Sequence, residues 1–377
     1  MRSRSVVALV VAFAGVFALA PAAQATPSST ESSIVTLGDS FISGEAGRWQ
    51  GNSIVSTGDR AGTDRAWTGT GYDPSRVYGA TAANGCHRSD VAEVNNAVVF
   101  VHRKVNLACS GAVTANIFRP SNGGQAQNGE PSQGLKLRFV AQVTNVKFVV
   151  LSIGGNDLGF ADIIRQCTQA YAARTGPCNP SQQAVVNSRK PAAFAGVAKA
   201  IDEIRAVMAE SGYSRSNYRL ILQSYGSPVP RASEARYAEL GADRGTVGGC
   251  PFYDADLNWA RDSLVNQIAN GLRYVAAASG VEFLDLRDSL QGREVCATAS
   301  RQATLMQPPS ASTSEWARFL TLNLAQGEVQ ETLHPNAYGQ KALGRCLTLA
   351  VNGGRGSGSC RPTSGRGPEG MVYTRFP

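Results

Sequence analysis

Five short and mostly apolar segments recur along this 377-residue chain, each too short for a typical buried helix. They lie at Ser33–Leu37, Val105–Ala108, Lys147–Ile153, Arg219–Gln223 and Val281–Asp285. Segments that are apolar throughout are typical of parallel strands, which are buried on both faces and need crossover connections. The pattern therefore predicts one α/β domain with a five-stranded parallel sheet covered by helices on both faces.

Helical periodicity predicts the elements that cover this sheet. We expect helices at Arg88–Asn95, Ala192–Ser211, Leu257–Ala278 and Ala337–Val351. Because no internal repeat or Pro-rich linker divides the chain, residues 26–352 are expected to form a single domain. Residues 44–85 are rich in Gly, Asp and Arg and predict a long irregular excursion of the kind that is usually functional. The Gly-, Arg- and Pro-rich residues 353–377 are expected to wrap the surface or fray as a C-terminal tail.

The N-terminal residues have the features of a secretion signal. Two arginines precede an apolar run from Val6 to Ala20, which is shorter than the roughly 20 residues that a membrane-spanning helix needs. The small-x-small pattern Ala23-Gln24-Ala25 follows, so residues 1–25 are predicted to be a signal peptide cleaved before Thr26. With no cysteine before Cys86, a lipid anchor at the new terminus is not expected. We therefore expect a secreted, extracellular protein without a stable membrane anchor.

Charge and cysteine content narrow the possible partners. The formal net charge is +8, but the arginines are dispersed and only six basic residues are lysines, whereas nucleic-acid binders concentrate basic residues locally. We therefore expect no nucleic-acid partner. Eight cysteines are an even number, which in an oxidising compartment favours disulfides. If neighbouring cysteines pair so that the shortest loops are closed first, the expected disulfides are Cys86–Cys109, Cys167–Cys178, Cys250–Cys296 and Cys346–Cys360.

Polar residues with catalytic potential follow several of the predicted strands, where open parallel sheets bind their ligands. Ser40 follows the first strand, Gly111 the second and Asn156 the third, and His334 precedes the last predicted helix. A serine hydroxyl needs an imidazole to take its proton, and the tetrahedral intermediate of acyl transfer needs fixed hydrogen-bond donors for its negative oxygen. These four residues therefore predict an acyl-transfer site.

The same residues resemble the SGNH, or GDSL, hydrolase superfamily over nearly the whole chain after residue 25. The motifs that carry the resemblance are Gly38-Asp39-Ser40, Cys86-His87-Arg88-Ser89, Ala108-Cys109-Ser110-Gly111, Gly154-Gly155-Asn156-Asp157 and His334-Pro335. Together with Phe41 to Glu45, they look like secreted actinobacterial esterases and lipases of that superfamily. The resemblance implies a three-layer α/β/α architecture with the flavodoxin-like strand order 2-1-3-4-5.

It also implies roles for individual residues. Ser40 would be the nucleophile, His334 the general base and then acid, and Ser40, Gly111 and Asn156 would line the oxyanion hole. The family usually has Asp three residues before the histidine, where this chain has Glu331. Glu331 is the candidate for the acid that orients the imidazole, with a backbone carbonyl as the alternative. Asp39 adjoins the nucleophile but is expected to be structural.

Other chemistries have little support in the sequence. Three histidines without metal-ligand spacing predict no catalytic metal, and we expect no cofactor. The expected activity is ester hydrolysis on a small-molecule or lipid ester by a monomeric enzyme. The 44–85 excursion, with Trp49, Trp67, Tyr72 and Tyr78, is expected to build one wall of the cleft, where its aromatics could hold an acyl chain, stack on a sugar or merely pack the loop. The alternatives are a carbohydrate acetyl esterase or acyltransferase on the same site and, less favoured, a non-catalytic binding protein.

Overall fold

The fold is taken from a computed structural model, which describes residues 30–55, 60–320 and 327–377. The signal peptide predicted over residues 1–25 lies outside the described residues. Within those described ranges, none of the helices combines the length and the apolar character that a membrane crossing requires.

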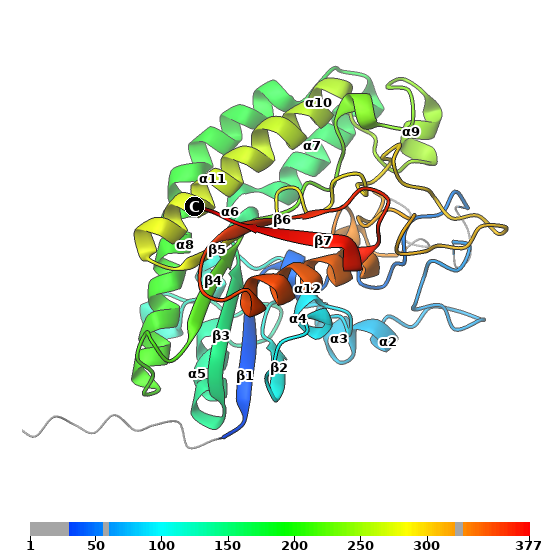
Figure 1. The fold of residues 1–377 in the computed structure, drawn as a ribbon. Helices are drawn as coiled ribbons and strands as arrows, with labels where there is room; N and C mark the ends of the chain where they lie inside the picture. The colour runs from blue at the N-terminus through cyan, green and yellow to red at the C-terminus, as the bar shows by residue number, and fades with distance from the viewer. Residues whose placement is uncertain (1–29, 56–59, 321–326) are drawn as a thin grey trace, which may run out of the picture.

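A single sheet of seven strands forms the centre of the molecule (Figure 1). In spatial order the strands are β2 (Arg103–Asn106), β1 (Ser32–Gly38), β3 (Asn145–Ser152), β4 (Arg219–Gln223), β5 (Glu282–Asp285), β6 (Gly358–Pro362) and β7 (Met371–Arg375). Strands β1 to β6 are parallel to their neighbours and β7 is antiparallel to β6. The predicted order 2-1-3-4-5 is confirmed for the first five strands.

The sheet has two strands more than expected, because β6 and β7 come from the segment that was expected to wrap the surface or fray. Strand β6 pairs with β5 through Leu284 and Gly358, so it covers backbone groups that would otherwise form an open edge. The segment is too polar and too rich in glycine to look like a strand in sequence. Its conformation is decided by the edge on which it pairs.

Helices cover the sheet in two layers (Figure 1). The longer helices are α5 (Gln133–Val143), α7 (Phe160–Ala173), α8 (Asn179–Glu210), α11 (Val265–Ser279) and α12 (Ala337–Asn352). The shorter ones are α1 (Ser40–Ser43), α2 (Ser75–Tyr78), α3 (Thr81–Asn84), α4 (Glu93–Asn96), α6 (Gly155–Leu158), α9 (Ala242–Thr246) and α10 (Asp254–Trp259). α5 and α11 pack on α8 in one layer, while α4 packs on α12 in the other.

Several helix predictions needed correction. Helices α5 and α7 were missed, and only α4 forms in the segment predicted as a helix over Arg88–Asn95. Helix α8 begins well before the predicted start at Ala192 and contains Pro191 in its interior. Proline usually marks a helix start, because it lacks the N–H that an interior position needs. Here Pro191 is exposed and the helix continues through it.

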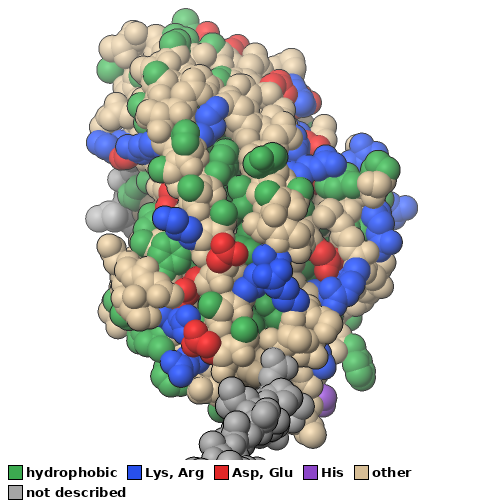
Figure 2. Space-filling model, turned by 90° about the vertical axis from the view of Figure 1, so that its left-hand side faces the viewer, with side chains coloured by type: hydrophobic (Ala, Val, Ile, Leu, Met, Phe, Trp, Pro, Cys, Tyr) green, Lys and Arg blue, Asp and Glu red, His purple; other side chains and the backbone are tan. Residues whose placement is uncertain are grey.

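The four disulfides are the pairs expected from the sequence. They join Cys86 to Cys109, Cys167 to Cys178, Cys250 to Cys296 and Cys346 to Cys360. The last of these bonds links α12 to β6 and so ties the C-terminal strands to the rest of the domain. Figure 2 shows basic and acidic side chains interspersed on the face drawn there, which agrees with the dispersed arginines of the sequence.

Candidate active site

Ser40 is exposed to the site by the tight turn that ends β1. Gly38 has a φ of +143°, and a Cβ at this position would lie 1.9 Å from the carbonyl oxygen of Ser152 in β3. Only glycine allows this close approach of the two strands. Asp39 then caps α1, because its Oδ1 accepts a hydrogen bond from the backbone N–H of Phe41 (3.1 Å). The result is that Ser40 is the first residue of α1, at the carboxyl end of the sheet.

Ser40 and His334 lie within hydrogen-bond distance although they are far apart in sequence. The distance between Ser40 Oγ and His334 Nε2 is 2.6 Å, and that between His334 Nδ1 and the carbonyl oxygen of Thr332 is 3.0 Å. Because a carbonyl oxygen only accepts, Nδ1 carries the proton and Nε2 is left to accept the hydrogen bond of the serine. Desolvation in the site lowers the pKa of His334 below its usual 6.5. The imidazole is therefore a neutral base at neutral pH.

Glu331 lies close to this pair but does not contact the imidazole, contrary to the first of the two expectations. Its carboxylate accepts hydrogen bonds from Trp49 Nε1 (2.8 Å) and from the hydroxyl of Tyr78 (2.7 Å), and it is fully buried. The structure instead places the carbonyl of Thr332 on Nδ1, the alternative that the sequence left open. Leu333, with a φ of +60°, turns the chain so that Thr332 O and the His334 ring face each other.

Two of the three residues predicted for the oxyanion hole, Ser40 and Asn156, lie at the same cavity. Helix α6 begins directly after Gly154, whose backbone is in the left-handed region, and Asn156 is its second residue. The Nδ2 of Asn156 donates a hydrogen bond to the carbonyl of Ala112 (2.9 Å). This bond fixes the amide beside the turn that carries Gly111 and leaves its second N–H free for a ligand. Asn156, Ser40 and His334 all line one cavity, whereas Gly111 is not part of its lining and is linked to Asn156 only through the carbonyl of the next residue, Ala112.

Tyr225 is a residue of this site that the sequence interpretation missed. Its hydroxyl donates to Asp39 Oδ2 (2.5 Å) and accepts from the backbone N–H of Gly155 (3.1 Å). Burial raises the pKa of Asp39 from 3.8 to about 7, against the lowering effect of this hydrogen bond. Tyr225 follows β4 by two residues, so a search of every strand end could have found it.

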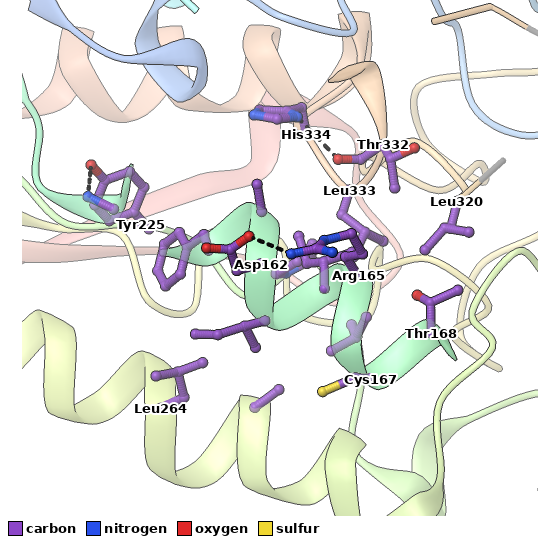
Figure 3. Close-up of a pocket in the computed structure, with 18 of the residues that line it drawn as sticks. Asp162, Arg165, Cys167, Thr168, Tyr225, Leu264, Leu320, Thr332, Leu333 and His334 are labelled. Atoms are coloured by element: carbon purple, nitrogen blue, oxygen red, sulfur yellow. Dashed lines mark hydrogen bonds and ion pairs between the residues drawn. The ribbon is translucent and has the colours of Figure 1, made fainter. Parts of the chain in front are cut away.

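A cavity of about 600 Å³ opens beside the Ser40–His334 pair (Figure 3). Most of the side chains that line this cavity are apolar. They come from α7, α10, the loop after β4 and the π-helical turn Ala260–Leu264 that joins α10 to α11. The main apolar residues of this lining are Phe160, Ile163, Ile164, Val229, Phe252, Leu257, Trp259, Leu264, Val265, Leu320 and Leu333. Figure 3 shows His334 and Thr332 on one side of the cavity and Leu264 on the opposite side.

The aromatic residues of the 44–85 excursion do not form a wall of this cavity, so of the alternatives left open for them the structure favours packing of the loop. Trp49 and Tyr78 are buried and hold the Glu331 carboxylate, while Trp67 packs against Tyr72 with a ring separation of 4.9 Å. None of the four lines the cavity. Trp49 and Tyr78 thus support the segment that carries His334, through Glu331. The cavity wall comes partly from the predicted helical segment Leu257–Ala278 and partly from α7, which the sequence analysis missed.

One group of side chains has the composition of a metal site. Among the described residues, Cys167, Cys178 and Asp256 have potential ligand atoms within 4.8 Å of one another. The two sulfurs are bonded to each other, and Asp256 accepts hydrogen bonds from the backbone N–H groups of Cys178 (3.2 Å) and Asn179 (2.8 Å). The group therefore has no thiolate to offer, and Asp256 helps to begin α8.

Fold and site together define the class of protein, an α/β ester hydrolase of the SGNH type. Residues 36–342 match the model of the GDSL-like Lipase/Acylhydrolase family, which is most of the chain. The chain belongs to this family, and it is a carboxylic ester hydrolase.

The chain is also similar to individual proteins of known name. The chain is 26% identical over 333 residues to a protein named Lipase 1 from Streptomyces coelicolor, covering 88% of this chain and 91% of that relative. An extracellular lipase from Streptomyces rimosus is 20% identical with a TM-score of 0.46. Phospholipase A1 from Streptomyces albidoflavus NA297 is 19% identical with a TM-score of 0.48. Each of these two solved structures covers 85% of this chain and 99% of its own.

Proposed function

We propose that this protein is a secreted serine esterase or lipase that works through an acyl-enzyme on Ser40. The observation that supports this most is the 2.6 Å contact between Ser40 Oγ and His334 Nε2. In the proposed reaction Oγ attacks the ester carbonyl while Nε2 takes its proton, and the C–O bond to the alcohol then breaks as Nε2 returns that proton to the leaving oxygen. Water repeats the sequence and releases the acid.

The donors for the intermediate are the backbone N–H groups of Ser40 and Gly111 and the free N–H of Asn156. Such donors stabilise the charge that develops on the carbonyl oxygen, and the loss of one typically costs about 3 kcal/mol of barrier. The carbonyl of Thr332 fulfils the orienting role that a carboxylate has in other hydrolases, because it fixes the tautomer of His334.

We propose that the acyl group of the substrate occupies the apolar cavity. A cavity of about 600 Å³, lined mostly by apolar side chains although Asp162 and Arg165 form an ion pair in its wall, is much larger than an acetyl group needs. This favours esters of longer acyl chains, such as lipids, over acetyl groups on a polysaccharide. Secretion is supported by four disulfides, which form in oxidising compartments. Protein recovered from culture medium should begin at Thr26.

The decisive test is the variant Ser40→Ala, with Ser188→Ala on the exposed face of α8 as the matched control. We expect Ser40→Ala to lose turnover of p-nitrophenyl esters by at least about 10³-fold and to lose labelling by a fluorophosphonate probe, because the nucleophile and its base act as a unit. Ser188→Ala should retain both. Full turnover by Ser40→Ala would refute the proposal.

A further inference from the structure

Tyr225 connects the two turns that carry the nucleophile and the oxyanion amide. Its hydroxyl donates to Asp39 Oδ2 at 2.5 Å and accepts from the N–H of Gly155 at 3.1 Å. Asp39 directly precedes Ser40, and Gly155 directly precedes Asn156. One buried side chain, 6% exposed, therefore holds both turns.

The ring of Tyr225 is also part of the cavity wall. It makes edge-to-face contacts with Phe41 (5.3 Å) and Phe160 (5.7 Å), which also line the cavity. A Cβ at position 155 would lie 2.9 Å from the Phe160 ring and 3.2 Å from Tyr225 Cζ, so both rings lie tightly against the Gly155 backbone. The backbone that carries Asn156 is therefore enclosed by packing on one side and a hydrogen bond on the other.

This arrangement matters because an oxyanion donor is effective only when it is already aimed at the developing charge. The Asn156 side chain is held by Ala112 O, but the backbone from which it projects is held by Tyr225 through Gly155. A displacement of about 1 Å at such a donor can cost on the order of 10²-fold in rate.

We propose that Tyr225 is a positioning residue for the oxyanion hole, whose hydroxyl keeps the Ser40 and Asn156 turns in register while its ring contacts the acyl chain. This inference rests on the proposed function of Ser40 and Asn156. The proposal assigns two separate effects to one side chain. The hydroxyl of Tyr225 contributes to kcat, and its ring contributes to the binding of the acyl chain.

The test is Tyr225→Phe, with Tyr213→Phe as the matched control. Tyr213 is another buried tyrosine whose hydroxyl donates to Thr144 O (2.5 Å) and accepts from Val146 N–H (3.0 Å), at the beginning of β3 and far along that strand from the site. Tyr225→Phe should lower kcat by about 10- to 100-fold, leave KM within about twofold and keep the wild-type preference between octanoyl and butanoyl esters. Tyr213→Phe should lose thermal stability without a change in kcat.

A Tyr225→Phe enzyme with kcat within twofold of wild type would overturn the inference, as would equal losses of kcat in both variants. If Tyr225→Phe does not fold, Asp39→Asn tests the same link from its other end, because asparagine can still cap α1 but removes one acceptor oxygen. It should lower kcat about tenfold, and an unchanged kcat would overturn the inference. Fluorophosphonate labelling of wild-type Ser40 keeps the two proposals apart, because failure of the proposed function abolishes labelling whereas failure of the Tyr225 role leaves it intact.

Discussion

The position of the acyl chain can be tested by filling the cavity from the π-helical turn. Ala260 lies in this turn and lines the cavity on the side formed by α10 and α11. The change Ala260→Phe introduces a ring into a volume of about 600 Å³. If the acyl chain lies in this cavity, the ring occupies part of its space and shortens the chain that can be accommodated.

The magnitude follows from the apolar surface that each methylene buries. A buried CH₂ contributes about 0.8 kcal/mol, which corresponds to roughly a fourfold gain in kcat/KM. Four additional methylenes, from butanoyl to octanoyl, therefore give an upper limit of about 3 kcal/mol, or on the order of 200-fold, in the wild-type enzyme. In Ala260→Phe we expect most of this gain to disappear for the longer chains, while acetyl and butanoyl esters are cleaved at nearly wild-type rates.

The assay is kcat/KM for p-nitrophenyl esters from acetyl to dodecanoyl. Ala255→Phe is the control, because Ala255 lies in α10 on the exposed side and does not line the cavity. It should reproduce the wild-type dependence on chain length. An unchanged dependence in Ala260→Phe would show that the chain binds elsewhere, and an equal change in both variants would show that the helix as a whole had moved.

Three further predictions concern buried ionisable groups. Glu331→Ala leaves the buried donors of Trp49 and Tyr78 without their acceptor. It should lower the free energy of unfolding, measured by guanidinium titration, by about 3 kcal/mol or more. A loss below about 1 kcal/mol would show that these hydrogen bonds do not hold Glu331 as described. Because desolvation lowers the pKa of His334, kcat/KM should rise to its plateau with a midpoint below pH 6.5, and a midpoint above this value would show that the imidazole is not desolvated. Burial raises the pKa of Glu294 from 4.5 to about 7, so the folded protein holds a proton that the unfolded chain releases between these values, and stability falls as pH rises through this window. Glu294→Gln should therefore be more stable than wild type above pH 7, by up to roughly 3 kcal/mol, with little difference near pH 4; equal stability at pH 8 would count against this explanation.

Much of the site could be predicted because its residues follow strands with a strong local signal. The apolar runs that became β1 and β3 are recognisable without their partners, and the ends of parallel strands meet at one edge of the sheet. The sequence pattern therefore predicts that Ser40 and Asn156 lie together. His334 lies in a turn before α12 and was a candidate as the imidazole that a serine nucleophile needs, while its role as base and then acid came from the family resemblance.

Other features depend on contacts between distant segments, which leave no local pattern. A backbone carbonyl such as Thr332 O is present in every residue, so nothing in the sequence distinguishes the one that orients His334. Glu331 has the sequence position of an orienting acid, but Trp49 and Tyr78, more than 250 residues earlier, take its carboxylate.

The amino-acid sequence alone determined the class of fold and the groups available for chemistry, because these depend on local periodicity and on residue type. It suggested the four disulfide pairs from spacing, but eight cysteines allow 105 pairings, and the structure decided among them. The tertiary structure decided which partner each group has, which helices enclose the cavity and where the last two strands pair. These depend on the burial and satisfaction of polar groups across the whole domain. A carboxylate or an amide binds the donor or acceptor that packing brings within reach, and sequence distance does not limit that choice.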